Sequence, residues 1–189
     1  IYPRQQNTVK RSPEHLLGAF VVWRSHITDE KGEKMTDEYY MRRAIALAQK
    51  GEGQVSPNPL VGAVIVKDEE IIGEGYHERY GQLHAERNAL AHCTKSPKGA
   101  TIYVTLEPCC HHGKQPPCTD ALLAAGIRRV VIGSKDPNPL VHGKGIRILR
   151  EHGVEVTEHV LEKECDAENE VFFHYMQTKL PFVILKYAM

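Results

Sequence analysis

The sequence predicts an α/β protein, a three-layer α/β/α sandwich around a mixed central sheet. Short β-branched runs alternate with stretches of helical periodicity after residue 36. The short segment Asp68–Glu70 turns the run 61–66 back into the run 71–76, so the two form a hairpin, whereas helices separate the later runs. The 189 residues are 41% hydrophobic and 25% charged, which is enough apolar material for a packed core.

Each predicted element begins or ends at a local signal. Thr36 or Asp37 caps the first helix, which Gly51 ends, and Gly126 and Gly153 end later helices. The predicted helices are the one after this cap, 85–93, 118–125, 144–152 and 161–177. The predicted strands are 61–66, 71–76, 101–106, 129–132, 154–156 and 182–187. The aromatic residues Tyr39, Tyr40, Phe172 and Phe173 are expected to pack in the core and between helices.

Two proline-locked turns, Ser56–Pro59 and Asp136–Pro139, interrupt these elements. Proline fixes φ and removes a donor, so the amide of Asn58 is held rigidly and suits the edge of a heterocycle. The alternative is an Asx turn. Asp136 and Asn138 follow a strand, where α/β sheets place ligand-binding groups.

Charge and cysteine content limit the functional classes. Lys plus Arg and Asp plus Glu are both 24, so a general nucleic-acid or anionic-membrane binder is not expected. The apolar run 16–23 is too short to span a bilayer. Five cysteines, an odd number, favour free thiols or metal ligands in a reducing cytoplasm over a disulfide scaffold.

Four residues predict a catalytic zinc site. His84, Cys109 and Cys118 supply one imidazole and two thiolates, which leaves a fourth tetrahedral position for water. Glu86 lies two residues after His84 and can move a proton without being a ligand. The alternatives are buried thiols without metal, or a structural zinc with a fourth ligand. The candidates for that fourth ligand are Cys110, His111 and His112.

Residues 36 to about 180 resemble the deaminase domain of the riboflavin-biosynthesis deaminase/reductases, which belong to the cytidine-deaminase-like superfamily. The matching stretches are 57–66, 75–77, 84–86, 105–118 and 136–139. The long spacing between Cys109 and Cys118 is the most specific feature, since related deaminases have two residues between these cysteines. Cys110 departs from the family pattern, which more often has a small hydroxyl residue there, and leaves open a swap of register with Cys109.

The resemblance implies a role for each matching residue. His84, Cys109 and Cys118 match zinc ligands, and Glu86 matches the proton-transfer glutamate. The positions that match the substrate pocket are Asn58, His77, His111, Lys114, Asp136 and Asn138. Taken alone, His77 and Lys114 would be ordinary solvated side chains.

The implied reaction is zinc-dependent deamination of 2,5-diamino-6-(5-phosphoribosylamino)pyrimidin-4(3H)-one to 5-amino-6-(5-phosphoribosylamino)uracil, with release of ammonia. The small-molecule phosphoribosylaminopyrimidine is the expected partner, and the cytoplasm is the expected location. The alternatives are another nucleobase, nucleoside or tRNA deaminase of the same zinc superfamily, and a zinc-stabilised scaffold without activity.

The expected organisation has three parts. Residues 1–34 form a poorly ordered extension, 35–180 the deaminase domain, and 181–189 the opening strand of a truncated reductase domain. The alternative for the last segment is an edge strand of the deaminase sheet. NADPH would serve only the missing reductase domain. The family also implies a possible homo-oligomer.

Overall fold

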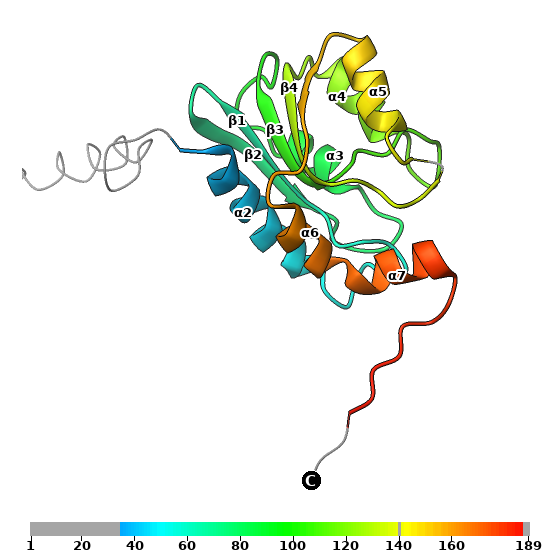
Figure 1. The fold of residues 1–189 in the computed structure, drawn as a ribbon. Coiled ribbons are helices and arrows are strands. Elements are labelled where there is room, and N and C mark those ends of the chain that lie inside the picture. The colour runs from blue at the N-terminus through cyan, green and yellow to red at the C-terminus, as the bar shows by residue number, and fades with distance from the viewer. Residues whose placement is uncertain (1–34, 140, 187–189) are drawn as a thin grey trace, which may run out of the picture. The chain divides into compact units, whose positions relative to one another are not determined.

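A five-stranded mixed sheet forms the centre of the fold in the computed structural model, which describes residues 35–139 and 141–186 (Figure 1). The predicted extension 1–34 lies outside the described residues. The strands are β1 (Gly62–Lys67), β2 (Glu70–Tyr76), β3 (Thr101–Leu106), β4 (Arg129–Ser134) and β5 (Glu155–Thr157). Their order is β2-β1-β3-β4-β5, with β1 antiparallel to β2 and β3, and β3, β4 and β5 parallel.

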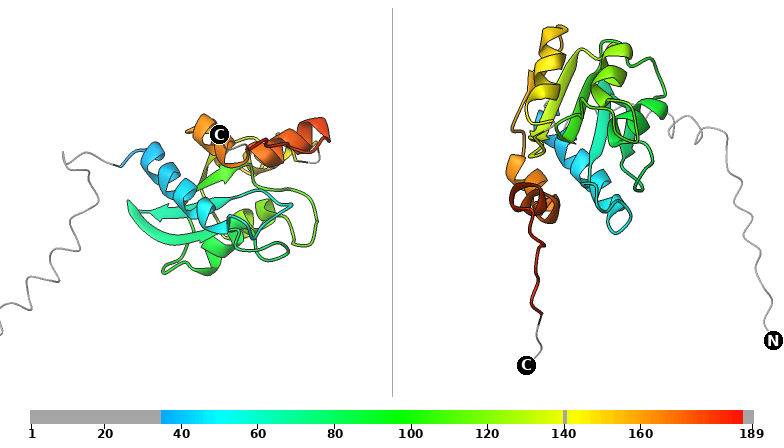
Figure 2. Two further views of the ribbon diagram at one scale, coloured as in Figure 1. Left: turned by 90° about the horizontal axis from the view of Figure 1, so that it is seen from below. Right: turned by 90° about the vertical axis from the view of Figure 1, so that its right-hand side faces the viewer.

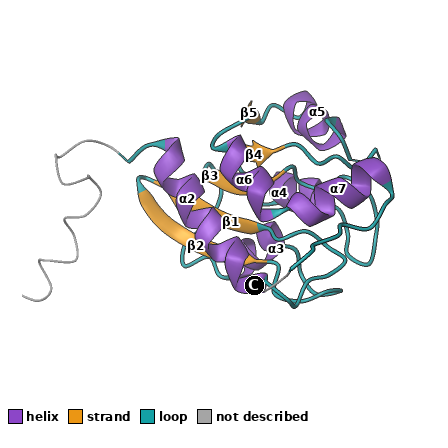
Figure 3. Cartoon of the chain, turned by 60° about the horizontal axis from the view of Figure 1, so that its bottom comes forward, coloured by secondary structure: helices purple, strands orange, loops and turns teal. Residues whose placement is uncertain are grey.

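Helices cover both faces of this sheet, which confirms the predicted three-layer sandwich (Figure 3). One face carries α2 (Asp37–Ala48) and α6 (Glu162–Glu168). The other carries α3 (Ala85–Ala91), α4 (Cys118–Ala124) and α5 (Lys144–Glu151). The short helix η3 (Gln49–Gly51) continues α2, and α7 (Glu170–Thr178) follows α6.

Alternation along the strands divides the core between the two faces. In β1, Ala63 and Ile65 pack with the helices α3, α4 and α5, whereas Val64 points to the side of α2. Every one of these side chains is fully buried. Burial of a valine or isoleucine side chain contributes about 1.5–3 kcal/mol to the free energy of unfolding. Thr36 begins α2 by accepting a hydrogen bond from the Tyr39 amide at 3.3 Å, which confirms this cap.

The long helix predicted over 161–177 is wrong, because it is interrupted at Asn169. This residue has φ −121° and ψ 21°, and it separates α6 from α7 (Figure 3). Its side-chain amide hydrogen-bonds the backbone of Leu60, at 2.8 Å in each direction. The periodicity of the sequence cannot show this break, since the competing partner lies 109 residues away.

The strand predicted over 182–187 is not formed in the part of the chain that the structure describes. Residues 181–186 pair with no strand and lead away from α7 (Figure 2). Val183, Ile184 and Leu185 are more than 70% exposed, so no neighbouring strand satisfies their backbone. None of the helices in 35–139 and 141–186 has the length and apolar character needed to cross a membrane.

Candidate active site

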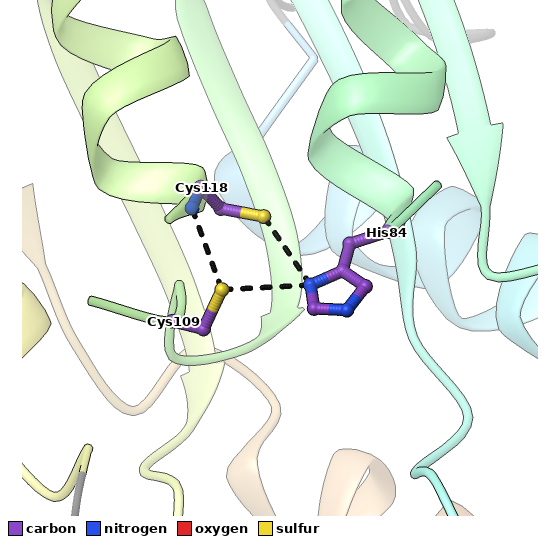
Figure 4. Close-up of side chains that lie close together, drawn as sticks. All are labelled: His84, Cys109 and Cys118. Atoms are coloured by element: carbon purple, nitrogen blue, oxygen red, sulfur yellow. Dashed lines mark hydrogen bonds between the residues drawn. The ribbon is translucent and has the colours of Figure 1, made fainter. Parts of the chain in front are cut away.

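Three metal-ligating side chains converge where two helices begin and one strand ends (Figure 4). His84 is the residue before α3, Cys118 is the first residue of α4, and Cys109 follows β3. Nδ1 of His84 lies 3.5 Å from Sγ of Cys109 and 3.5 Å from Sγ of Cys118. We call these three residues the metal corner.

The spacing of the metal corner fits zinc. Its three donor atoms lie within 4.8 Å of one another. Tetrahedral zinc, with bonds of about 2.0 Å to nitrogen and about 2.3 Å to sulfur, places such donors about 3.5 Å apart. The cluster found among the described residues includes Cys109 rather than Cys110, and it includes neither His111 nor His112. This composition supports the predicted register and gives no support to a four-ligand structural site.

Close packing of α3 on β2 fixes the position of His84. A Cβ atom on Gly75 would lie 2.3 Å from the Ala89 amide nitrogen, so only glycine lets the helix approach this strand. Asn88 secures the same contact by donating from Nδ2 to the Tyr76 carbonyl at 3.0 Å. The start of α3 is therefore held against β2 of the core.

Hydrogen bonds from two helices hold the cysteine loop against α3. Arg87 donates to the carbonyls of Pro116 and Pro117 at 3.2 and 2.8 Å, just before Cys118. The Thr119 amide donates to the Cys109 carbonyl at 3.2 Å. The first contact ties the end of the stretch between the cysteines to α3, and the second joins the two cysteine positions directly.

The metal corner stabilises negative charge on one sulfur. Hydrogen bonds from Cys118, and then from the His84 ring, lower the pKa of Cys109 to about 4. The same sulfur raises the pKa of His84, and it raises that of Cys118 by competing as the acceptor. A thiolate is the form that binds zinc, so one of the two sulfur ligands is already prepared.

Glu86 lies in the first turn of α3 and is 3% exposed. Burial, with the nearby Cys109 sulfur second, raises its pKa to about 7. A carboxyl with a pKa near neutrality can both accept and return a proton, which a carboxylate with an ordinary pKa does poorly. Its place beside the metal corner therefore suits proton transfer.

A cavity of about 260 Å³ opens over the metal corner. His84, Glu86 and Cys109 line it, whereas Cys118 lies beneath and is fully buried. All six side chains predicted for the substrate pocket also line it: Asn58, His77, His111, Lys114, Asp136 and Asn138. The structure thus brings together residues from five separate parts of the chain.

Asn58 and His77 form a bonded pair at one side of the cavity. Nδ2 of Asn58 lies 3.1 Å from Nε2 of His77, and Nδ1 of His77 lies 3.0 Å from the Leu83 carbonyl. His77 is only 3% exposed, so it is not a solvated surface residue, and burial lowers its pKa. The ring is therefore neutral near pH 7 and fixed in orientation.

Asp136 and Asn138 enter the cavity from the loop after β4. Oδ1 of Asp136 accepts a hydrogen bond from the Asn138 amide at 2.8 Å, and burial raises its pKa to about 6. The buried carboxylate of Glu107 anchors the end of this loop by accepting from the amides of Gly143 and Gly145 at 2.9 and 3.1 Å. Glu107 thereby couples this loop to Cys109, two residues further along.

His111 and Lys114 come from the stretch between the cysteines. Nδ1 of His111 is buried and has no hydrogen-bond partner among the described residues. A buried unpaired polar atom is costly, so it marks a place where a ligand is expected to bond. Nζ of Lys114 lies 3.9 Å above the ring of Tyr80, at the exposed rim of the cavity.

The structure adds lining residues that the sequence did not indicate. Tyr80 and Phe172 contribute aromatic rings, and Val61 and Leu106 contribute aliphatic surface. Phe172 does not pack in the core, because α7 has no fully buried residue, but its half-buried ring does contact that of Phe173, at 6.0 Å between centroids. No signal in the sequence separates Phe172 from its neighbour Phe173, which does not line the cavity.

This fold and site are those of a zinc deaminase: H-x-E at the start of one helix, and a cysteine at the start of another. Residues 34–134 match the family described as the cytidine and deoxycytidylate deaminase zinc-binding region. The chain belongs to this family and, within it, to the diaminohydroxyphosphoribosylamino-pyrimidine deaminases, as the relatives below show.

The chain is 51% identical over 147 residues to the diaminohydroxyphosphoribosylamino-pyrimidine deaminase of Buchnera aphidicola, and the match covers 78% of this chain and 100% of that one. It is 64% identical over 155 residues to the riboflavin biosynthesis protein RibD of Actinobacillus pleuropneumoniae, covering 82% of this chain and 41% of the relative. The solved structure of Acinetobacter baumannii RibD, form 1, superposes with a TM-score of 0.75 at 48% identity, and the match covers 77% of this chain and 41% of that one. The chain thus spans about two-fifths of the length of the RibD relatives.

Proposed function

We propose that this chain deaminates 2,5-diamino-6-(5-phosphoribosylamino)pyrimidin-4(3H)-one to 5-amino-6-(5-phosphoribosylamino)uracil, a step of riboflavin biosynthesis. The observation that carries the proposal is a buried Glu86 lining the same cavity as His84 and Cys109. The identity to the deaminase of Buchnera aphidicola along that protein's whole length supports this substrate.

We assign the metal corner as the zinc site. His84, Cys109 and Cys118 would hold the ion through Nδ1 and two sulfurs. Zinc, when bound, lowers the pKa of a water molecule from 15.7 towards about 7 and so makes a nucleophile available at neutral pH. All remaining parts of the reaction fall to side chains of this chain.

Glu86 is the proton carrier in this proposal. Its carboxylate accepts a proton from the attacking water and delivers it to the ring nitrogen next to the amino-bearing carbon. It then takes the proton of the newly added hydroxyl group and passes it to the amino group, which leaves as ammonia while the carbon keeps the oxygen as a carbonyl. Water and the amine are consumed, and the carbonyl and ammonia are formed, without oxidant or reductant.

The bonded pair of Asn58 and His77 supplies a fixed polar edge for the pyrimidine. Because the Nε2 contact holds the Asn58 amide, its oxygen and remaining N–H can be presented in one orientation. Asp136 and Asn138 present a second polar edge from the loop after β4. His111, whose Nδ1 lacks a partner among the described residues, can gain one from the substrate.

Lys114 is the group we assign to the phosphoribosyl arm. It is exposed at the rim of the cavity, where an ammonium over the Tyr80 ring can also meet a phosphate from solvent. A negatively charged arm at the rim leaves the neutral pyrimidine to enter the deeper part beside Glu86.

We further propose the predicted organisation for the whole protein. Residues 35–180 would form the deaminase domain. Residues 181–189, which form no strand where the structure describes them, would become the first strand of a reductase domain only when that domain follows, and any NADPH requirement belongs to it. The two-fifths coverage of the RibD relatives supports this division. We place the reaction in the cytoplasm, because the five cysteines are all outside disulfides, as is usual in a reducing compartment.

The test is a comparison of substrates on the zinc-loaded protein. Ammonia release is measured from the phosphoribosylaminopyrimidine, cytosine, guanine and a tRNA adenosine substrate under identical conditions. We expect turnover of the first and none of the others above background. Preferred turnover of any other compound would assign the same chemistry to a different substrate and overturn the proposal.

A further inference from the structure

One helix of the fold reaches the cavity without carrying any residue of the zinc-deaminase motif. Phe172, in the first turn of α7, lines the cavity together with Asn58 and Glu86. Its neighbours Val171 and Phe173 do not line it. Hydrogen bonds at the start of α7 determine whether Phe172 is held in this position.

The contact is built by Asn169, three residues before Phe172. Asn169 is 3% exposed, and both ends of its side-chain amide are used. Oδ1 accepts from the Leu60 amide, and Nδ2 donates to the Leu60 carbonyl, both at 2.8 Å. A side chain that mimics strand pairing in this way fixes two backbone segments against each other.

The same residue also starts α7. The Phe173 amide donates to the Asn169 carbonyl at 2.8 Å, and the helix follows from there. Leu60 directly follows the proline-locked turn that contains Asn58. Asn169 therefore holds Phe172 in register with the Asn58 side of the cavity. We call Asn169 and Phe172 the α7 wall.

The chemistry of the cavity gives the ring a function. Most of the side chains that line the cavity are polar or ionisable, and such groups can hydrogen-bond the edge of a heterocycle. A flat ring also has faces, which polar edge contacts leave uncovered. An aromatic side chain covers such faces at low entropic cost.

We infer that Phe172 is a specificity-determining residue against which the bound phosphoribosylaminopyrimidine packs, and that Asn169 is the positioning residue that sets it. This inference rests on the proposed function. It assigns α7, which lies outside the matched 34–134 region, a direct part in binding the substrate.

The first test compares neighbouring phenylalanines in zinc-loaded protein. Phe172→Ala is expected to raise KM roughly tenfold and change kcat less than threefold, because apolar contact is made equally in the bound and transition states. The product should bind about tenfold more weakly in calorimetric titration. Phe173→Ala is the matched control, because this half-buried ring contacts Phe172 at 6.0 Å between centroids but does not line the cavity.

Phe172→Leu keeps apolar volume and should recover most of the lost affinity. Equal KM values for Phe172→Ala and Phe173→Ala, or a loss confined to kcat, would overturn the inference. The wild-type protein separates this failure from that of the proposed function, because a wild type without turnover on this compound refutes the function itself.

The second test asks whether the two residues act as one unit. Asn169→Ala should raise KM in the same direction, and adding Phe172→Ala should raise it no further. Multiplied effects in the double variant would show that Asn169 does not act through Phe172. A KM unchanged in Asn169→Ala, with only the midpoint of unfolding lowered, would show a purely structural role.

Discussion

The metal corner and the α7 wall lie on the same cavity, yet the chain builds them in opposite ways. The metal corner uses residues at the ends of β3, α3 and α4, elements that the core fixes directly. The α7 wall stands on a helix without a fully buried residue, and one buried amide group holds it.

This difference separates chemistry from recognition. A metal with a proton carrier tolerates little displacement, so its ligands belong on the rigid ends of core elements. A surface that selects among substrates can be supplied by a helix at the edge of the core, held here by the hydrogen bonds of the Asn169 amide to Leu60. Variants of the two regions should therefore fail differently, the first in metal content and kcat, the second in KM.

The largest effect is expected at the metal corner itself. Cys118→Ala should reduce bound zinc from about one per chain to near zero and abolish turnover, because two protein ligands hold the ion far more weakly than three. Elemental analysis after dialysis measures the zinc. Cys110→Ala is the matched control and should keep both metal and activity. Zinc retained by Cys118→Ala and lost by Cys110→Ala would reverse the ligand assignment.

The next effect separates proton transfer from metal binding. Glu86→Gln keeps the shape of the buried side chain but cannot carry a proton, so turnover should fall by about 10²–10⁴-fold. Zinc content should stay at the wild-type value, and Glu52→Gln, on an exposed residue, should be without effect. Near-normal turnover of Glu86→Gln would remove this residue from the mechanism.

Asp136 tests whether the polar edge of the cavity costs stability. Its folded pKa is raised from 3.8 to about 6, chiefly by burial, so the folded state binds the extra proton between these values and stability falls as pH rises through them. Asp136→Asn cannot ionise and keeps an oxygen for the Asn138 amide. It should be up to about 3 kcal/mol more stable than wild type at pH 8, with little difference at pH 4.

Urea unfolding of the substrate-free proteins at both pH values measures this change. The activity of Asp136→Asn should fall while its free energy of unfolding at pH 8 rises. A stability difference that is the same at pH 4 and pH 8 would show that ionisation of Asp136 carries no cost.

The smallest effect is expected at Asp37, outside the cavity, where ionisation of the carboxyl stabilises the folded state instead of destabilising it. Arg129 donates to both oxygens of Asp37 at 2.8 and 2.7 Å and lowers its pKa. The contribution of the ionised Asp37 to the free energy of unfolding is present above its unfolded pKa, and it is lost as pH falls through its folded pKa. Because Asp37 is about one-third exposed, Asp37→Asn should cost only about 1 kcal/mol at pH 7. A variant that is equally destabilised in acid and at pH 7 would contradict this sign.

Much of the fold could be predicted from the sequence, because each core strand and helix carries its own pattern and end signals. The hairpin, the mixed sheet and the starts of α3 and α4 are confirmed. The break at Asn169 could not be predicted, since it depends on a hydrogen bond to Leu60, far away in the chain. The strand predicted over 182–187 rests on apolar character and on a resemblance to the opening strand of a reductase domain, neither of which supplies a pairing partner within this chain.

The residues of the candidate site likewise divide into those that a sequence pattern predicts and those that depend on tertiary contacts. His84, Glu86, Cys109 and Cys118 form a pattern whose chemistry can be recognised before their positions are known. Tyr80 and Phe172 have no such pattern, because an aromatic residue on a helix or loop reads equally as packing. Their part in the cavity depends on tertiary contacts, such as the one between the Tyr80 ring and Lys114.

The most direct test of the account is a zinc titration of metal-free protein, followed by ammonia release from the phosphoribosylaminopyrimidine. The account predicts no turnover after chelation and recovery that saturates at one zinc per chain. Turnover that survives complete removal of the metal would contradict it.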